Sequence, residues 1–174
     1  MKYLKIIVIT FIVVFTSTLS KSETKVAFIE LEKIIQKSDV GKSLIDQLNT
    51  LDKMNKKYFS DYKNKLEEKK AKIAAQKNIL SEEEYKKKVV SLNNEFASFQ
   101  KEAQEKAGLI KSKRNKAMNT ILEKLNTLLT DYSNKNGLTF IIDQKNIVIG
   151  KSELNISDEV IKLLNQQLKK ISIN

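Results

Sequence analysis

The sequence predicts an α+β protein in which a long antiparallel helical hairpin projects from a small β body. The 174 residues contain no Pro, no Trp and four Gly, and 30% of them are charged. This composition is typical of long helices and not of a many-stranded β fold. In the middle of the chain, apolar residues recur at alternating spacings of three and four, which indicates a coiled-coil seam. Short apolar runs of strand type lie near both ends of the chain.

Residues 1–20 are predicted to be a secretory signal peptide. Lys2 and Lys5 precede an apolar run from Ile6 to Phe15, and small polar residues follow. A run of about ten residues is too short to cross a membrane as a helix. We expect cleavage after residue 20, or alternatively after Ser22, and export of the mature chain. An uncleaved N-terminal anchor is the alternative.

The hairpin, which we call the arm, is expected over residues 42–129. Its first helix is predicted from Lys42 to Leu80, after a helix N-cap at Ser38. Residues 81–84 read Ser-Glu-Glu-Glu, the pattern of a capping box, and mark the start of the second helix. Two long helices joined by a turn near residues 80–82 must run antiparallel.

The seam between the two arm helices is expected to contain the aromatic and aliphatic residues Tyr58, Tyr62, Leu66, Val89, Leu92, Phe96 and Phe99. We interpret the four aromatic residues as seam packing, with a binding patch for other polypeptides as the alternative. Gly108 lies inside the second helix, where Gly costs about 1 kcal/mol relative to Ala. It is a candidate flexion point of the arm, and a tolerated surface glycine is the alternative.

The body is expected to combine residues 21–41 with residues 130–174. A strand is predicted from Val26 to Leu31, and the second arm helix should end at Asn136-Gly137. Residues 138–142 and 147–150 are predicted to pair as a β-hairpin, and residues 157–159 to cap a last helix. Three short strands bury little on their own and leave open edges, so we expect an oligomer whose sheets merge. The apolar residues expected at the subunit contacts are Val26, Phe28, Leu138, Phe140, Ile142, Ile147 and Ile149.

The positive charge of the chain is concentrated in the arm. The formal net charge is +11, and between Lys53 and Lys116 there are 18 basic and 9 acidic residues. Outside this segment and the signal peptide, the two signs balance. A basic surface attracts acidic polypeptides from a distance, although runs of Lys are also typical of an ordinary solvated helix face. The lysines expected to form a diffuse binding surface are Lys56, Lys57, Lys69, Lys70, Lys72, Lys77, Lys86, Lys87 and Lys88.

The residue types that are missing exclude several kinds of chemistry. Without His or Cys, the chain cannot form a Cys/His zinc site, a Ser-His-Asp or Cys-His nucleophile pair, or a disulfide. A metal held by carboxylates alone and an Asp/Glu acid–base pair remain as alternatives. We expect a protein that is not an enzyme, with no catalytic residues, no metal site and no cofactor.

Two segments resemble the Skp/OmpH family of periplasmic chaperones. Residues 25–42, KVAFIELEKIIQKSDVGK, resemble the opening of that family. Residues 132–165, which contain NGLTFIIDQKNIVIGKSELNISDEVIKLLN, resemble its closing part. The order of these motifs around a Lys-rich hairpin is the strongest part of the likeness. The resemblance implies a homotrimer with a central β-barrel and three arms. It further implies an ATP-independent holdase in the periplasm of a Gram-negative bacterium, which binds unfolded outer-membrane proteins.

Two other functional classes remain as alternatives. A structural coiled coil of the cell envelope would share the hairpin but would not affect the aggregation of other proteins. A basic helical protein can also bind nucleic acid through phosphates. The predicted signal peptide and the single Arg argue against nucleic acid as a partner. The arm lysines could also contact anionic lipid or lipopolysaccharide.

Overall fold

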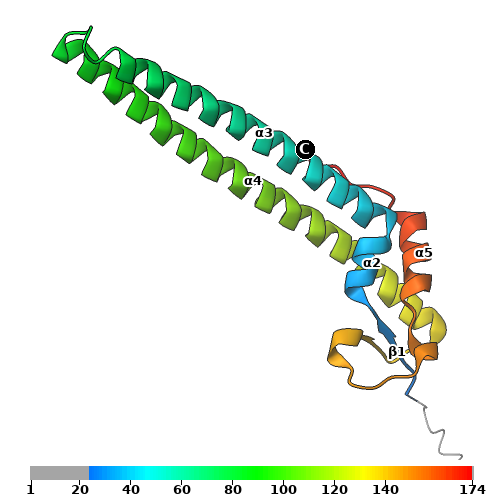
Figure 1. The fold of residues 1–174 in the computed structure, drawn as a ribbon. Helices are drawn as coiled ribbons and strands as arrows, with labels where there is room; N and C mark the ends of the chain where they lie inside the picture. Colours follow the sequence, from blue (N-terminus) through cyan, green and yellow to red (C-terminus); the bar gives the residue numbers. More distant parts are fainter. Residues whose placement is uncertain (1–23, 174) are drawn as a thin grey trace, which may run out of the picture.

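The computed structural model describes residues 24–173, so the predicted signal peptide lies outside the described residues. Figure 1 shows a long arm of two antiparallel helices, with the remaining elements gathered at one end of it. In chain order, the elements are β1 (Val26–Ile29), α2 (Leu31–Lys37), α3 (Asp39–Ala75), α4 (Glu82–Asn136), β2 (Phe140–Asp143), η1 (Gln144–Asn146), η2 (Ser152–Leu154) and α5 (Ser157–Gln167).

The predicted helix ends at three positions are confirmed. The Ser38 hydroxyl accepts a hydrogen bond from the Gly41 N–H and caps α3. Ser81 and Glu84 form the complete capping box of α4. Gly137 ends α4 with φ 64°, in the left-handed region that favours glycine. These caps satisfy backbone groups that a helix end would otherwise leave without a partner.

The first arm helix ends five residues earlier than predicted. It stops at Ala75 and not at Leu80, and residues 76–80 form the connection to α4. The N–H groups of Ile79 and Leu80 both donate to the Gln76 carbonyl oxygen, which closes a tight turn. The chain needs several residues to reverse direction between two antiparallel helices. The residues predicted as the last turn of the first helix form this connection.

The predicted β-hairpin is wrong. Only β1 and β2 form a sheet among the described residues, and they pair in parallel with Val26 opposite Phe140 and Phe28 opposite Ile142. Residues 147–150 form no strand. After β2, the Asp143 carboxylate accepts from the Lys145 N–H and starts η1, which turns the chain away from the sheet. The chain returns at Asn155, which forms a bridge with Phe28, so two strands replace the expected three.

Two smaller predictions at the body also need correction. The first strand ends at Ile29, because Leu31 already begins α2. Ser157 is the first residue of α5 and not its cap, and the Asn155 carboxamide oxygen accepts from the Ser157 N–H. The buried Ser157 hydroxyl instead accepts from the Glu30 N–H at 2.7 Å. It therefore joins the two ends of the body.

The buried apolar residues form two separate clusters. The base core, where the arm meets the body, contains Ile29, Ile34, Val40, Leu44, Ala117, Ile121, Leu125, Leu128, Val160, Leu164 and Ile173. The distal core, further along the arm, contains Leu66, Ile73 and Leu92. No residue of α3 between Leu44 and Leu66, and none of α4 between Leu92 and Ala117, is buried. The middle of the arm therefore lacks a closed core.

Candidate functional site

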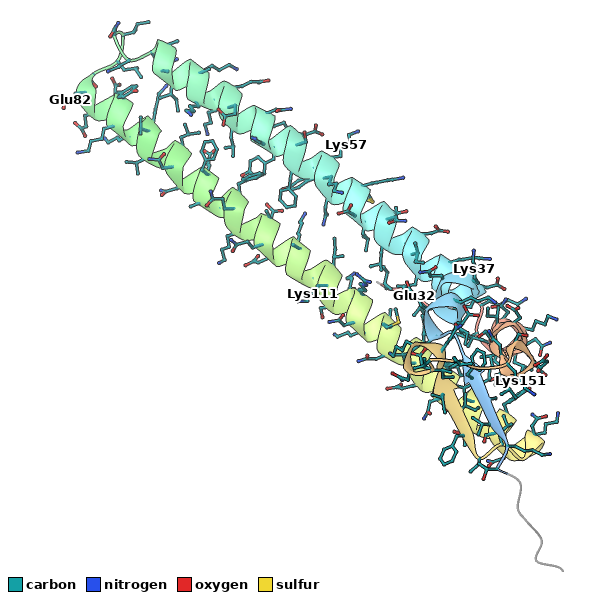
Figure 2. All side chains as sticks on the ribbon, turned by 60° about the horizontal axis from the view of Figure 1, so that its bottom comes forward. Glu32, Lys37, Lys57, Glu82, Lys111 and Lys151 are labelled. Atoms are coloured by element: carbon teal, nitrogen blue, oxygen red, sulfur yellow. The ribbon has the colours of Figure 1, made fainter. Side chains whose placement is uncertain are left out.

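The distal core holds the two arm helices together near the tip. Leu66 and Ile73 of α3 meet Leu92 of α4, and partly buried aromatic and aliphatic residues pack around them. This set consists of Tyr62, Tyr85, Val89, Phe96 and Phe99. Figure 2 shows aromatic side chains between the two helices, whereas long side chains project outward along both of them.

Four aromatic rings meet at the inner end of the distal core. The Phe99 ring of α4 lies edge-on to two rings of α3, at 5.6 Å from the Phe59 centroid and 5.2 Å from the Tyr62 centroid. Tyr58 lies edge-on to Phe59 at 5.1 Å. Such edge-to-face pairs are favourable beyond their buried area. The sequence analysis did not identify Phe59, although the Phe59, Tyr62 and Leu66 positions have the three-then-four spacing of a seam.

A charged pair covers the exposed side of this aromatic cluster. Tyr58, which is 42% exposed, donates its hydroxyl to the Glu102 carboxylate at 3.2 Å. The Lys106 ammonium lies 4.1 Å from the Tyr58 ring centroid and 3.2 Å from the same carboxylate. The hydrogen bond to Glu102 raises the pKa of Tyr58. The cluster thus presents both an aromatic face and a fixed cation to solvent.

All nine lysines of the predicted binding surface are exposed. Four of them have carboxylate partners: Lys56 pairs with Asp52, Lys69 with Glu95, Lys70 with Glu67 and Lys87 with Glu83. Lys88 donates to the Gln76 carboxamide at 2.8 Å. Of the nine, Lys57, Lys72, Lys77 and Lys86 have neither an ion pair nor a side-chain hydrogen bond within residues 24–173. These four positive charges are therefore available to another molecule.

Exposed apolar side chains accompany the lysines on the arm. Met54, Ile79, Val90 and Leu109 are all more than half exposed or close to it. Each lies within a few residues of a lysine in the sequence. Gly108 lies in the middle of the arm, and a Cβ atom added there would meet nothing within 4 Å. The arm surface thus combines exposed apolar side chains with lysines that are close to them in the sequence.

The predicted subunit-contact residues fall into two groups. Phe28 is buried within the body, and Val26, Leu138 and Ile147 are half-buried. Phe140, Ile142 and Ile149 are exposed, and so is their neighbour Val148. The exposed fractions of Val148 and Ile149 are 98% and 91%. A two-stranded sheet also leaves an open edge on each side, apart from the Asn155 bridge.

In the described part of the chain, a cavity of 760 Å³ lies beside α2 and η1 and is lined by three acidic and three basic residues among others. Among residues 24–173, no group of three or more carboxylates is placed to hold a metal ion. Within the same residues, every helix is too short or too polar to cross a membrane. The exposed lysines and apolar side chains of the arm make its surface the candidate functional site.

Comparison with known proteins gives the family. A crystal structure of an OmpH-like protein from Caulobacter crescentus CB15, described as a candidate outer membrane chaperone, has the same fold with a TM-score of 0.81. The two chains are 16% identical, and the match covers 91% of this chain and 94% of the other. No curated protein sequence matches this chain. The family model for OmpH-like outer membrane proteins matches residues 25–164. The chain belongs to the OmpH-like family.

Proposed function

We propose that this protein is an ATP-independent holdase chaperone of the periplasm. It binds unfolded outer-membrane proteins, its clients, and keeps them from aggregating on the way to the outer membrane. The observation that carries this proposal is the arm surface, which exposes both lysines and apolar side chains. Family membership and the description of the Caulobacter relative as a candidate chaperone support it.

The chemistry of the arm suits an unfolded client. Unfolded chains vary in sequence, so they require many weak contacts and not one shaped pocket. The excess of 18 basic over 9 acidic residues between Lys53 and Lys116 attracts acidic segments from a distance. Exposed residues such as Met54 and Leu109 then offer apolar contact. Lysine binds as a hydrated point charge, which favours diffuse attraction over specific recognition.

We further propose that the functional unit is a homotrimer in which the bodies form a common β-barrel and the arms enclose a cavity. Phe140, Ile142, Val148 and Ile149 are exposed apolar side chains of the body that a monomer would leave in water. The open strand edges supply backbone groups for pairing between chains. Light scattering on the mature chain should give three times the monomer mass, and a monodisperse monomer at micromolar concentration would contradict the trimer.

The predicted signal peptide over residues 1–20 supports a periplasmic location. Export would place the mature chain in the compartment that outer-membrane proteins cross. Mass spectrometry of the protein from a periplasmic fraction tests this, and we expect a new N-terminus after residue 20 or Ser22. A protein that retains Met1 and stays with the membrane fraction would instead be an anchored protein.

The holdase activity is tested by dilution of a urea-unfolded outer-membrane barrel protein into buffer, with and without the mature chain. We expect suppressed turbidity at about one trimer per client, with weaker suppression as the salt concentration rises. Unchanged aggregation at low salt would refute the holdase and favour the structural coiled coil. Addition of anionic vesicles as competitors distinguishes a lipid-binding arm from one that prefers polypeptide.

The role of arm charge is tested by reversal of the four lysines of the predicted binding surface that have neither an ion pair nor a side-chain hydrogen bond. In the test variant, Lys57, Lys72, Lys77 and Lys86 become Glu. This breaks no ion pair among the described residues and lowers the net charge of the segment from Lys53 to Lys116 from +9 to +1. Client capture measured by stopped-flow should slow by about tenfold or more. The matched control reverses four exposed lysines outside this segment, Lys42, Lys135, Lys151 and Lys162, and should capture the client at nearly the normal rate.

A further inference from the structure

The C-terminal tail, residues 168–173, lies along the base of the arm. It leaves α5 and runs back beside α3, as the red segment of Figure 1 shows. Its side chains alternate: Ile171 is half-buried, Ser172 is exposed, and Ile173 is buried with an exposed fraction of 7%. Ile173 belongs to the base core, and Leu168 and Ile171 pack against it. This alternation is that of an extended strand with one face against the protein.

A single glutamine of α3 binds the tail through its backbone. The Gln47 carboxamide donates to the Ile171 carbonyl oxygen at 2.7 Å, and its own oxygen accepts from the Ile173 N–H at 3.4 Å. Gln47 thus meets both kinds of backbone group, as the edge of a neighbouring strand would. These contacts are available to an extended chain of any sequence. Specificity for the tail rests on the apolar side chains at alternate positions.

The groove that holds the tail continues beyond it. A hollow of 340 Å³ lies next to Ile173, and it is lined by Asp46, Gln47, Thr50 and Leu51 of α3 and by Lys113 of α4. Leu51 packs against the base core, and Asp46 and Lys113 contribute charged groups to the lining. A chain longer than the tail could therefore extend along the same groove. We call it the tail groove.

The tail follows the part of the chain that matches its family. The OmpH-like model matches residues 25–164, so residues 168–173 lie beyond the matched region. The body elements β1, β2 and most of α5 fall within the match. The tail packs on the arm base, next to the surface proposed to receive clients.

We propose that the tail groove is a binding site for an extended apolar segment of an unfolded polypeptide, and that the chain's own tail occupies it as an intramolecular competitor. This inference rests on the proposed holdase function, because it names a site for the same clients. A tail joined directly to α5 has an effective concentration on the order of millimolar. A short free peptide competes poorly with it. A client that the arm already holds also has a high effective concentration at the tail groove, so it can exchange with the tail.

The test uses a fluorescein-labelled peptide of residues 169–174 and measures its binding by fluorescence anisotropy. The chain ending at Leu168 lacks the competitor, and we expect it to bind the peptide at least about fivefold more tightly than the full chain. The full-length Ile173→Asp variant should bind similarly, because the aspartate cannot enter the apolar site. Ser172→Asp is the matched control, since it adds the same charge at an exposed position, and it should bind like the normal chain.

Two further measurements locate the bound peptide. Gln47→Ala in the chain ending at Leu168 should lose the added affinity, because the backbone contacts are gone. A peptide with serine in place of both isoleucines should bind no variant. The inference is overturned if removal of the tail and Ile173→Asp both leave the affinity unchanged. It is also overturned if removal of the tail lowers the oligomer mass, because the tail would then occupy a second copy of the chain.

The failure of this inference can be separated from failure of the holdase. If the chain still suppresses aggregation but the peptide binds no variant, the inference about the tail groove fails and the holdase proposal stands. Peptide binding by the chain ending at Leu168, without aggregation suppression by any variant, refutes the holdase and the client role of the groove. If the holdase proposal and the tail-groove inference are both correct, the chain ending at Leu168 should retain the client several times longer than the full chain in a dilution-release experiment.

Discussion

The base and the distal part of the arm use the same two helices but differ in what holds those helices together. At the base, eleven buried residues come from β1, α2, α3, α4, α5 and the tail. Near the tip, three buried residues come from α3 and α4 alone. Between the two cores, neither helix has a buried residue. The base is therefore a tertiary core, whereas the distal arm depends on one helix–helix contact and on its own caps.

Two glycines give the largest expected contrast between these regions. A Cβ atom added at Gly41 would lie 1.5 Å from the Ile35 carbonyl oxygen, whereas one added at Gly108 meets nothing within 4 Å. Gly41→Ala should destabilise the protein by about 3 kcal/mol or more, because α2 and α3 must separate. Gly108→Ala should stabilise it by about 1 kcal/mol. Urea unfolding followed by circular dichroism measures both.

Gly108→Ala also tests the predicted flexion of the arm. If bending at this glycine serves client binding, the more stable variant should suppress aggregation less well than the normal chain. Equal suppression would leave Gly108 as a tolerated surface residue. A Gly41→Ala protein of normal stability would show that α2 and α3 are not packed backbone against backbone.

Truncation of one buried residue in each core should give the next largest effect. Ile121 of the base core and Leu66 of the distal core are both almost fully buried. Ile121→Ala should cost about 3 kcal/mol, and Leu66→Ala about 2 kcal/mol, because the two-helix contact can close over the gap. Hydrogen exchange should show faster amides throughout α2, α4 and α5 for Ile121→Ala. For Leu66→Ala, the change should stay within the arm, and a spread into the body would mean that arm and body unfold as one unit.

The cap at the arm tip should have a smaller and local effect. Ser81→Ala removes the hydroxyl that accepts from the Glu84 N–H at 3.3 Å, and should cost about 1 kcal/mol. Faster hydrogen exchange should be confined to the first turn of α4. Ser98→Ala, at an exposed position in the same helix, is the matched control and should leave exchange unchanged. Exchange that accelerates at the base core would contradict the independence of the tip.

Two tyrosines allow a comparison by pH. The hydrogen bond to Glu159 raises the pKa of Tyr132, at the body, from 10.0 to about 12. Because the folded state favours the neutral phenol, this contact stabilises the fold below pH 10 and is lost as the pH rises through about 12. In a tyrosine absorbance titration, Tyr132→Phe should remove the step near pH 12. Tyr58→Phe, its counterpart in the arm, should leave that step in place.

The local parts of this fold were predictable, and the long-range parts were not. Ser38, Ser81 and Gly137 act through residues within one helical turn, so their roles can be read from neighbours in the sequence. The pairing of β1 with β2 joins segments at opposite ends of the chain, and nothing local distinguishes it from a hairpin of residues 138–150. The apolar run Ile147–Ile149 resembles a strand, yet Val148 and Ile149 are solvent-exposed.

The candidate site was predicted in outline but not in its details. The runs of lysine identify the basic face of the arm. The spacing of apolar residues identifies seam residues such as Leu66 and Leu92. These patterns do not show that Glu95 pairs with Lys69, or that Phe59 takes a place in the aromatic cluster beside Tyr58. These choices depend on the rotation of α3 against α4. The tail was missed because its two isoleucines make too short a pattern to indicate a strand.

The parallel pairing of β1 with β2 also sets an order of folding. The whole arm lies between these two strands in the sequence. The contacts between α3 and α4 form as the helical hairpin closes. Val26 emerges early in synthesis and cannot meet Phe140 until both long helices have been made. Loop closure over that distance is slow unless the hairpin first shortens it. The arm helices should therefore pair before β1 pairs with β2. A chain that ends before β2 would form the arm but would lack a complete body, and so could not assemble into an oligomer.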